Sequence, residues 1–252
     1  MNLFQISPPT RFDLRFSIAG IPVRVHPLFW LIALLLGSTS RSIWGVLIWL
    51  VVIFISILVH ELGHAFAFRR FGQPSSIILH FSGGLTVPES VPWGGGYANV
   101  SLTPNQHIFI SLAGPGAGFL LAVLALAVGA AIGGTIVPAT ILGIIPIPMI
   151  LFSDGNNLLN QFFVSFLWVN IFWGLINLLP VIPLDGGNVC RYFLIQRDPL
   201  NGLRTSLWIS VVIGALAAVG GFLLLDSIYM AFLFGMLAFQ SFQLLQGIAG
   251  RF

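Results

Sequence analysis

Residues 59–66 read VHELGHAF and place two histidines and a glutamate within five consecutive positions. On an α-helix, residues four apart lie on one face, so His60 and His64 offer two imidazole nitrogens to the same point. Glu61 lies beside them, where it can act as general base toward a water activated by a metal ion. The preceding residues, WGVLIWLVVIFISIL, are apolar, so this water chemistry would lie at the end of a segment that excludes water.

A catalytic zinc ion usually takes three protein ligands and keeps one position open for water, so a third ligand must come from elsewhere. Asp185, in NLLPVIPLDGGNV, is our candidate because it follows an apolar span and matches the depth of the two histidines. Pro180 and Pro183 stop the helix before it. The glycines at 186 and 187 permit an irregular backbone that aims the carboxylate inward.

Two alternatives stay open for these acids. Glu89 competes with Asp185 as the third ligand, and Asp185 could instead cap a helix that begins near Asn188.

Hydrolysis by an activated water needs no cysteine nucleophile, so Cys190 is expected to be inert.

The composition places these residues in a membrane protein. The chain has 252 residues, of which 57% are hydrophobic and 7% are charged, whereas a soluble domain carries about 25% charged residues. The basic residues are scattered and form no patch for nucleic acid. The single cysteine excludes an internal disulfide. The first 25 residues lack the apolar region of a cleavable signal peptide, so we expect the first apolar span to be a membrane helix.

Six apolar spans predict an all-α polytopic membrane protein with about six transmembrane helices. Most of them approach the ~20 residues that cross a bilayer core. The first is too short to span upright and is expected to thin the bilayer locally. The spans are residues 27–37, 43–68, 107–132, 158–179, 207–225 and 229–248.

The arginines predict the orientation of these spans. If the spans alternate strictly, nine of the ten arginines share a side with the N-terminus and only Arg41 lies opposite. Basic residues in short loops mark the cytoplasmic face. We therefore expect both termini in the cytoplasm, in a membrane of the bacterial inner-membrane type.

Two stretches do not fit simple spans. Residues 72–104 are rich in Gly, Pro and Ser and contain a β-like run at 76–87, SIILHFSGGLTV. This run predicts a small re-entrant β element between the second and third helices, with an edge for strand addition by a peptide; a plain cytoplasmic loop is the alternative. His80 within it is not expected to bind zinc. Residues 135–157 are apolar but contain three prolines, so we expect an interfacial segment on the outer side.

Three motifs resemble the site-2 protease family of intramembrane zinc metalloproteases: HELGH at 60–64, SLAGPGAG at 111–118 and NLLPVIPLDGG at 177–187. The start FSIAGIPVRVHPLFW also looks like family members with a minimal membrane core. The resemblance implies that His60, His64 and Asp185 ligate one zinc ion and that Glu61 is the catalytic base. It also implies that Asn177 contacts the substrate, although a buried amide can equally hold helices together.

The chain departs from the family pattern in two ways. Many relatives have Asn at the position of Gly118, so any role of that side chain is absent here. Many also carry a PDZ-type domain or a CBS pair, and neither fits in this length, which puts control by a tethered sensor in doubt. The glycines of SLAGPGAG are expected to serve close helix packing.

The sequence therefore predicts a single transmembrane metalloprotease domain over residues 1–252, with residues 1–26 as a cytoplasmic N-terminal segment. Its expected function is hydrolysis of peptide bonds in or near transmembrane helices of membrane-protein substrates. One rival is a metal-binding transporter, which would place further polar residues along several spans. A second rival is an inactive relative that binds membrane helices without cutting them, and the presence of Glu61 argues against it.

Overall fold

The computed structural model describes residues 8–37, 42–81, 83–89, 91–93, 96–98, 101–141, 145–153 and 157–249. Within these residues, five helical segments are long and apolar enough to cross a membrane. The predicted first span forms a shorter apolar helix, α1 (Pro27–Gly37). The long segments are α2 (Ile43–Arg70), α3 (Pro104–Ala131), the continuous run of α4 (Asn157–Trp168), η1 (Val169–Trp173) and α5 (Gly174–Asn177), then α7 (Gly202–Leu223) and α8 (Ile228–Ala249).

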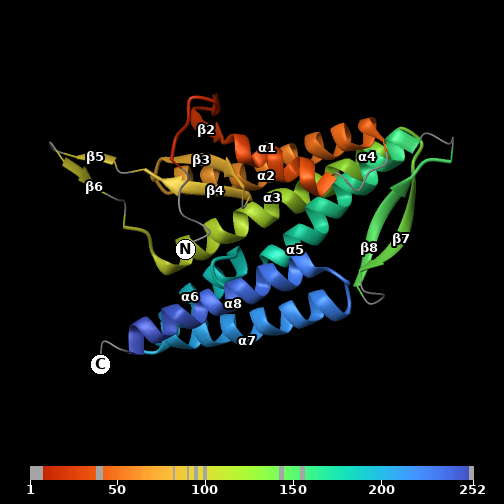
Figure 1. Ribbon diagram of the computed structural model, residues 1–252. Helices are drawn as coiled ribbons and strands as arrows, with labels where there is room; N and C mark the ends of the chain where they lie inside the picture. The colour runs from red at the N-terminus through yellow and green to blue at the C-terminus, as the bar shows by residue number, and fades with distance from the viewer. Residues whose placement is uncertain are drawn as a thin grey trace.

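The long helices run side by side in two groups (Figure 1). Helices α1 to α4 form one group, and α7 and α8 pack against each other as a second. Between the groups lie α5 and the short helix α6 (Asp185–Arg197). Large apolar side chains such as Trp44, Leu120 and Leu216 are exposed on the outside of this bundle. Such exposure is expected of helices whose solvent is lipid.

A four-stranded sheet lies against the end of α2 that carries the HELGH motif, and it holds more strands than the sequence predicted. Its order is β1-β2-β3-β4, with β2 and β3 parallel and the other pairs antiparallel. The β-like run at 76–87 corresponds to the hairpin of β3 and β4, whereas β1 and β2 come from residues 1–26, for which the sequence predicted only a cytoplasmic N-terminal segment. The strands are β1 (Leu14–Ile18), β2 (Ile21–Val25), β3 (Ser75–His80) and β4 (Gly83–Pro88).

Buried and less buried residues alternate along β2, and this pattern shows which face of the sheet is buried. Ile21, Val23 and Val25 are buried while the residues between them are not, as expected for a strand with one face on a core. They pack with Ile77 and Leu79 of β3 against α2. Because β4 pairs with β3 alone within the described residues, its other side is a free strand edge facing the bundle.

The segment expected to lie at the outer interface forms an antiparallel hairpin of β7 (Thr135–Ile141) and β8 (Ile145–Leu151). Ile147, Met149 and Ile150 are buried in a cluster with Phe163 and Phe166 of α4. The hairpin is therefore part of the hydrophobic core at the far end of the bundle (Figure 1). A further short pair, β5 (Val91–Trp93) and β6 (Gly96–Ala98), precedes α3.

Candidate metal centre

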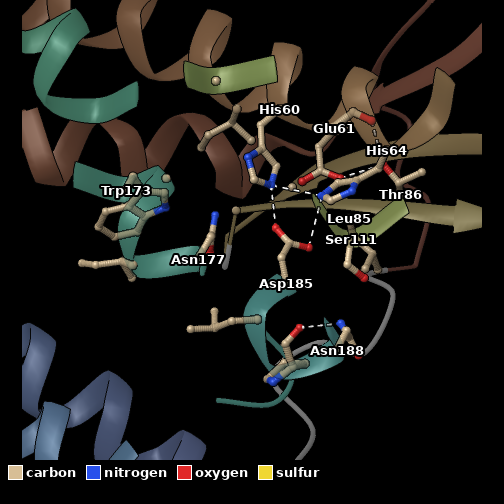
Figure 2. A pocket seen from close by; sticks show the side chains of 18 of the residues that line it. His60, Glu61, His64, Leu85, Thr86, Ser111, Trp173, Asn177, Asp185 and Asn188 are labelled. Atoms are coloured by element: carbon tan, nitrogen blue, oxygen red, sulfur yellow. Dashed lines mark hydrogen bonds and ion pairs between the residues drawn. The ribbon is translucent and has the colours of Figure 1, made fainter. Parts of the chain in front are cut away.

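Helices α2 and α6 bring three possible metal ligands together (Figure 2). The Nε2 atoms of His60 and His64 are 3.1 Å apart. Asp185, the first residue of α6, places one carboxylate oxygen 3.1 Å from Nε2 of His60 and the other 3.3 Å from Nε2 of His64. The glutamate that competed as third ligand, Glu89, is exposed after β4 and is not part of this group.

These distances fit a shared metal ion. Ligand atoms bonded to a tetrahedral zinc at about 2.0–2.1 Å lie roughly 3.3 Å from each other. Nδ1 of His64 lies 2.7 Å from the carbonyl oxygen of Ile110 and can donate to it. That bond selects the tautomer whose Nε2 carries a lone pair, as in metal-binding histidines whose other nitrogen is held by the protein. Two nitrogens and a carboxylate are a donor set suited to zinc.

The carboxyl group of Asp185 is held in its charged form. Burial alone would raise its pKa, but hydrogen bonds from the imidazoles of His60 and His64, together with their positive charge when they are protonated, outweigh burial and lower the pKa to about 2. The group is therefore an anion at neutral pH, the form in which a carboxylate ligates a metal.

Two glycines set the position of Asp185. A Cβ atom added to Gly186 would lie 2.0 Å from the carbonyl oxygen of Leu178, and one added to Gly187 would lie 2.5 Å from the backbone of Val181. The connecting loop thus folds directly onto the first turn of α6. The sequence predicted that the two glycines permit an irregular backbone. Instead they lie in the first turn of α6, where their lack of side chains lets the preceding loop pack directly against the helix.

Helix α3 closes the site from the other side of the histidines. A Cβ atom on Gly114 would lie 2.2 Å from Nε2 of His64 and 2.8 Å from Nε2 of His60. Close packing was the expected use of the SLAGPGAG glycines, and at Gly114 the packed groups are the two imidazoles themselves. By contrast, Gly116 would meet nothing within 4 Å.

The base predicted from the motif, Glu61, is buried beside the ligands with 6% of its surface exposed. Thr86 of β4 donates a hydrogen bond from Oγ1 to Oε2 of Glu61 at 2.7 Å. A Cβ atom on Gly84, two residues earlier on the same strand, would lie 2.4 Å from Oε1 of Glu61. Strand β4 therefore forms one wall around the glutamate side chain, a contact that the sequence did not predict.

The three candidate ligands and Glu61 line a pocket of about 570 Å³ between the two helix groups. His107, Asn188 and Tyr192 line it as well, and the rings of His107 and Tyr192 stack with centroids 4.1 Å apart. Asn177, at the end of α5, also lines this pocket and lies near Asp185 in Figure 2. A peptide entering the pocket would thus meet an amide close to the candidate ligands.

The lining of the pocket includes another polar pair, Asn170 and Ser56. Asn170 donates hydrogen bonds to Oγ of Ser56 and to the carbonyl oxygen of Phe166, each at 2.8 Å. Asn170 lies in η1, a π-helical turn of the kind that inserts one extra residue in a helix. Its bond to Ser56 joins η1 to α2.

Comparison with known proteins agrees with this geometry. The sequence model of peptidase family M50 matches residues 48–219, a span that contains both histidines, Glu61 and Asp185. The chain belongs to peptidase family M50. Its structure is also similar to the site-2 protease from Methanocaldococcus jannaschii, with a TM-score of 0.52 and 25% identity over 92% of this chain and 94% of that one.

Two relatives match about 70% of this M50 chain. The zinc metalloprotease MJ0392 of Methanocaldococcus jannaschii is 27% identical over 187 residues, which cover 72% of this chain and 45% of that protein. Rip3 of Mycobacterium tuberculosis is 31% identical over 199 residues, which cover 71% of this chain and 43% of that protein. The matched part of the chain thus spans about half the length of these curated relatives. The family and the apolar helices together identify a multi-pass membrane protein.

Proposed function

We propose that the protein is an intramembrane zinc metalloendopeptidase that hydrolyses peptide bonds in or near transmembrane helices of membrane-protein substrates. The observation that carries the proposal is the meeting of Nε2 of His60, Nε2 of His64 and the carboxylate of Asp185, with Glu61 beside them in one pocket. Membership of family M50 and the likeness to a site-2 protease support the same reaction.

Each side chain then has a defined task. His60, His64 and Asp185 would hold one zinc ion, which would supply Lewis-acid chemistry and make a water molecule more acidic. Glu61 accepts a proton from that water and later delivers it to the leaving amine. Since water attacks the peptide carbonyl directly, no serine or cysteine nucleophile is required.

The substrate must be extended before it can be cut, because a helix hides its peptide groups. Residues 83–86 of β4, whose outer edge has no partner strand among the described residues, line the pocket, and this edge can offer main-chain groups to an extended segment. We propose that the substrate pairs there and that Asn177 donates or accepts a hydrogen bond at its backbone. Polar groups within the depth of the bilayer are tolerated here because they line a cavity that water can enter.

We further propose that both termini lie in the cytoplasm and that the membrane is a bacterial inner membrane. The support is the distribution of arginines: if α1 crosses together with the five longer segments, nine of the ten fall on the same side as the N-terminus. Reporter fusions at each terminus test this orientation, and an active periplasmic reporter at either end would contradict it.

Cleavage of a model membrane segment in detergent tests the function. We expect the purified protein to cut the segment, Glu61→Gln to lose at least about a hundredfold in rate, and 1,10-phenanthroline to abolish cleavage reversibly. Glutamine keeps the size of the side chain but cannot take the proton. Equal cleavage by both proteins would rule out the proposed mechanism. Metal uptake into vesicles without cleavage would instead identify a transporter.

A further inference from the structure

Strand β4 contacts Glu61 at two positions that share one face of the strand. Side chains alternate along a strand, so residues 84 and 86 point to the same side, while Val87 points to the other. On that side Gly84 leaves space for the carboxylate, and Thr86 binds it. Figure 2 shows Thr86 and Glu61 facing each other beside the histidines.

The hydrogen bond distinguishes the two oxygens of the carboxylate. The single hydroxyl proton of Thr86 is directed to Oε2 at 2.7 Å, and the main-chain oxygen of Glu61 lies farther away at 3.1 Å. Oε2 of Glu61 therefore already accepts a hydrogen bond. Oε1 lies against Gly84, whose missing side chain leaves room for it. Within the described part of the chain no hydrogen-bond donor is assigned to Oε1, so its lone pairs can take a proton from water.

We propose that Thr86 is a positioning residue for Glu61: its hydroxyl holds Oε2 and thereby presents Oε1 as the base. This inference rests on the proposed function, because it assigns a partner to the base of that reaction. Thr86 also lies on the free edge strand, which is the strand offered to the substrate. A substrate segment that pairs with β4 would therefore hold in place the strand that positions Glu61.

The test compares Thr86→Val, which keeps the shape of the side chain and lacks the hydroxyl, with Thr86→Ser, which keeps the hydroxyl. A general base that is misplaced by about 1 Å loses up to a hundredfold in rate. We expect Thr86→Val to lower kcat about 10- to 100-fold with KM within about twofold of wild type. Thr86→Ser should recover kcat to within about threefold, because the bond to Oε2 can form again.

The matched control is Val87→Thr, which makes a comparable change on the other face of the same strand and should leave kcat within about twofold. Bound zinc, measured by metal analysis, should equal that of wild type in all variants, since Thr86 contacts none of the ligand atoms. Should Thr86→Val not fold, Thr86→Ala serves with the same expectation.

Each outcome decides the matter. Unchanged kcat in Thr86→Val would overturn the inference, as would a serine variant as slow as the valine variant. A rise in KM with unchanged kcat would show that Thr86 serves substrate binding and would also overturn it. These results are distinct from failure of the proposed function, which would appear as wild type and Glu61→Gln having equal activity.

Discussion

Substitution of Gly114 by alanine tests how tightly the metal centre is packed. Gly114 lies on α3, where it faces the two imidazoles of α2. The added methyl group would lie 2.2 Å from Nε2 and 2.4 Å from Cε1 of His64, and 2.8 Å from Nε2 of His60. The new contact therefore falls on the candidate ligand atoms of the two histidines.

The size of the displacement follows from these distances. Carbon and nitrogen atoms in contact settle at about 3.5 Å, so the imidazole of His64 must move by roughly 1.3 Å or α3 must move by the same amount. Metal–ligand distances tolerate only about 0.2 Å. We expect Gly114→Ala to bind less than about a tenth of a zinc ion per chain and to lose at least about a hundredfold in cleavage rate.

Gly116→Ala is the matched control, because it lies on the same helix two residues later and its Cβ meets nothing within 4 Å. It should keep one zinc ion per chain and wild-type cleavage. Metal analysis of protein purified in detergent, together with the model-segment assay, measures both variants. Full zinc content and activity in Gly114→Ala would refute the close packing of α3 on the ligands.

Two further predictions concern stability, measured by thermal unfolding in detergent. Burial opposes the charge on Asp13, but hydrogen bonds from Thr10 and Arg24 lower its pKa from 3.8 to about 2. Because the pKa is lower in the folded state than in the unfolded state, this carboxylate stabilises the fold above pH ~4 and loses its effect as pH falls toward ~2. The unfolding temperature of wild type should therefore exceed that of Asp13→Asn at pH ~6 and match it near pH ~2. Gly186→Ala should destabilise by about 3 kcal/mol or more because its Cβ meets backbone, whereas Gly235→Ala, whose nearest neighbour is 4.0 Å away, should unfold like wild type. A persistent difference at pH 2, or equal unfolding of the two alanine variants, would contradict these expectations.

The helices were predictable from the sequence because lipid demands long uninterrupted apolar runs. The predicted start of α2 at residue 43 and the short span at 27–37 agree with the structure. The sheet was only half predicted. Strands β1 and β2 carry arginines and read as a polar tail, and the pairing of β2 with β3 joins residues 21–25 to 75–80 across two intervening helices. No local pattern reports such a distant pairing.

The same limit applies to the site. His60 and His64 share a face by helical periodicity alone, and Asp185 was found by matching its depth to theirs. The structure brings all three together, and their roles as ligands stay predictions. Thr86 bonds to a residue 25 positions earlier, across a change from helix to strand. A threonine in a β-like run carries no signal of such a contact, so sequence reasoning missed it.

The sheet also explains how water chemistry can take place beside lipid. A strand edge exposed to lipid leaves its peptide groups without partners, at several kcal/mol each. The edge strand β4 avoids that cost because residues 83–86 line the pocket, where water or an extended peptide can satisfy them. The same strand gives Glu61, a nearly buried carboxylate, the hydrogen-bond donor that a buried charge needs. A bundle of helices alone would offer no such strand edge, since its peptide groups are bonded within each helix. We therefore infer that β4 is the element that makes a hydrolytic site compatible with a helical membrane fold.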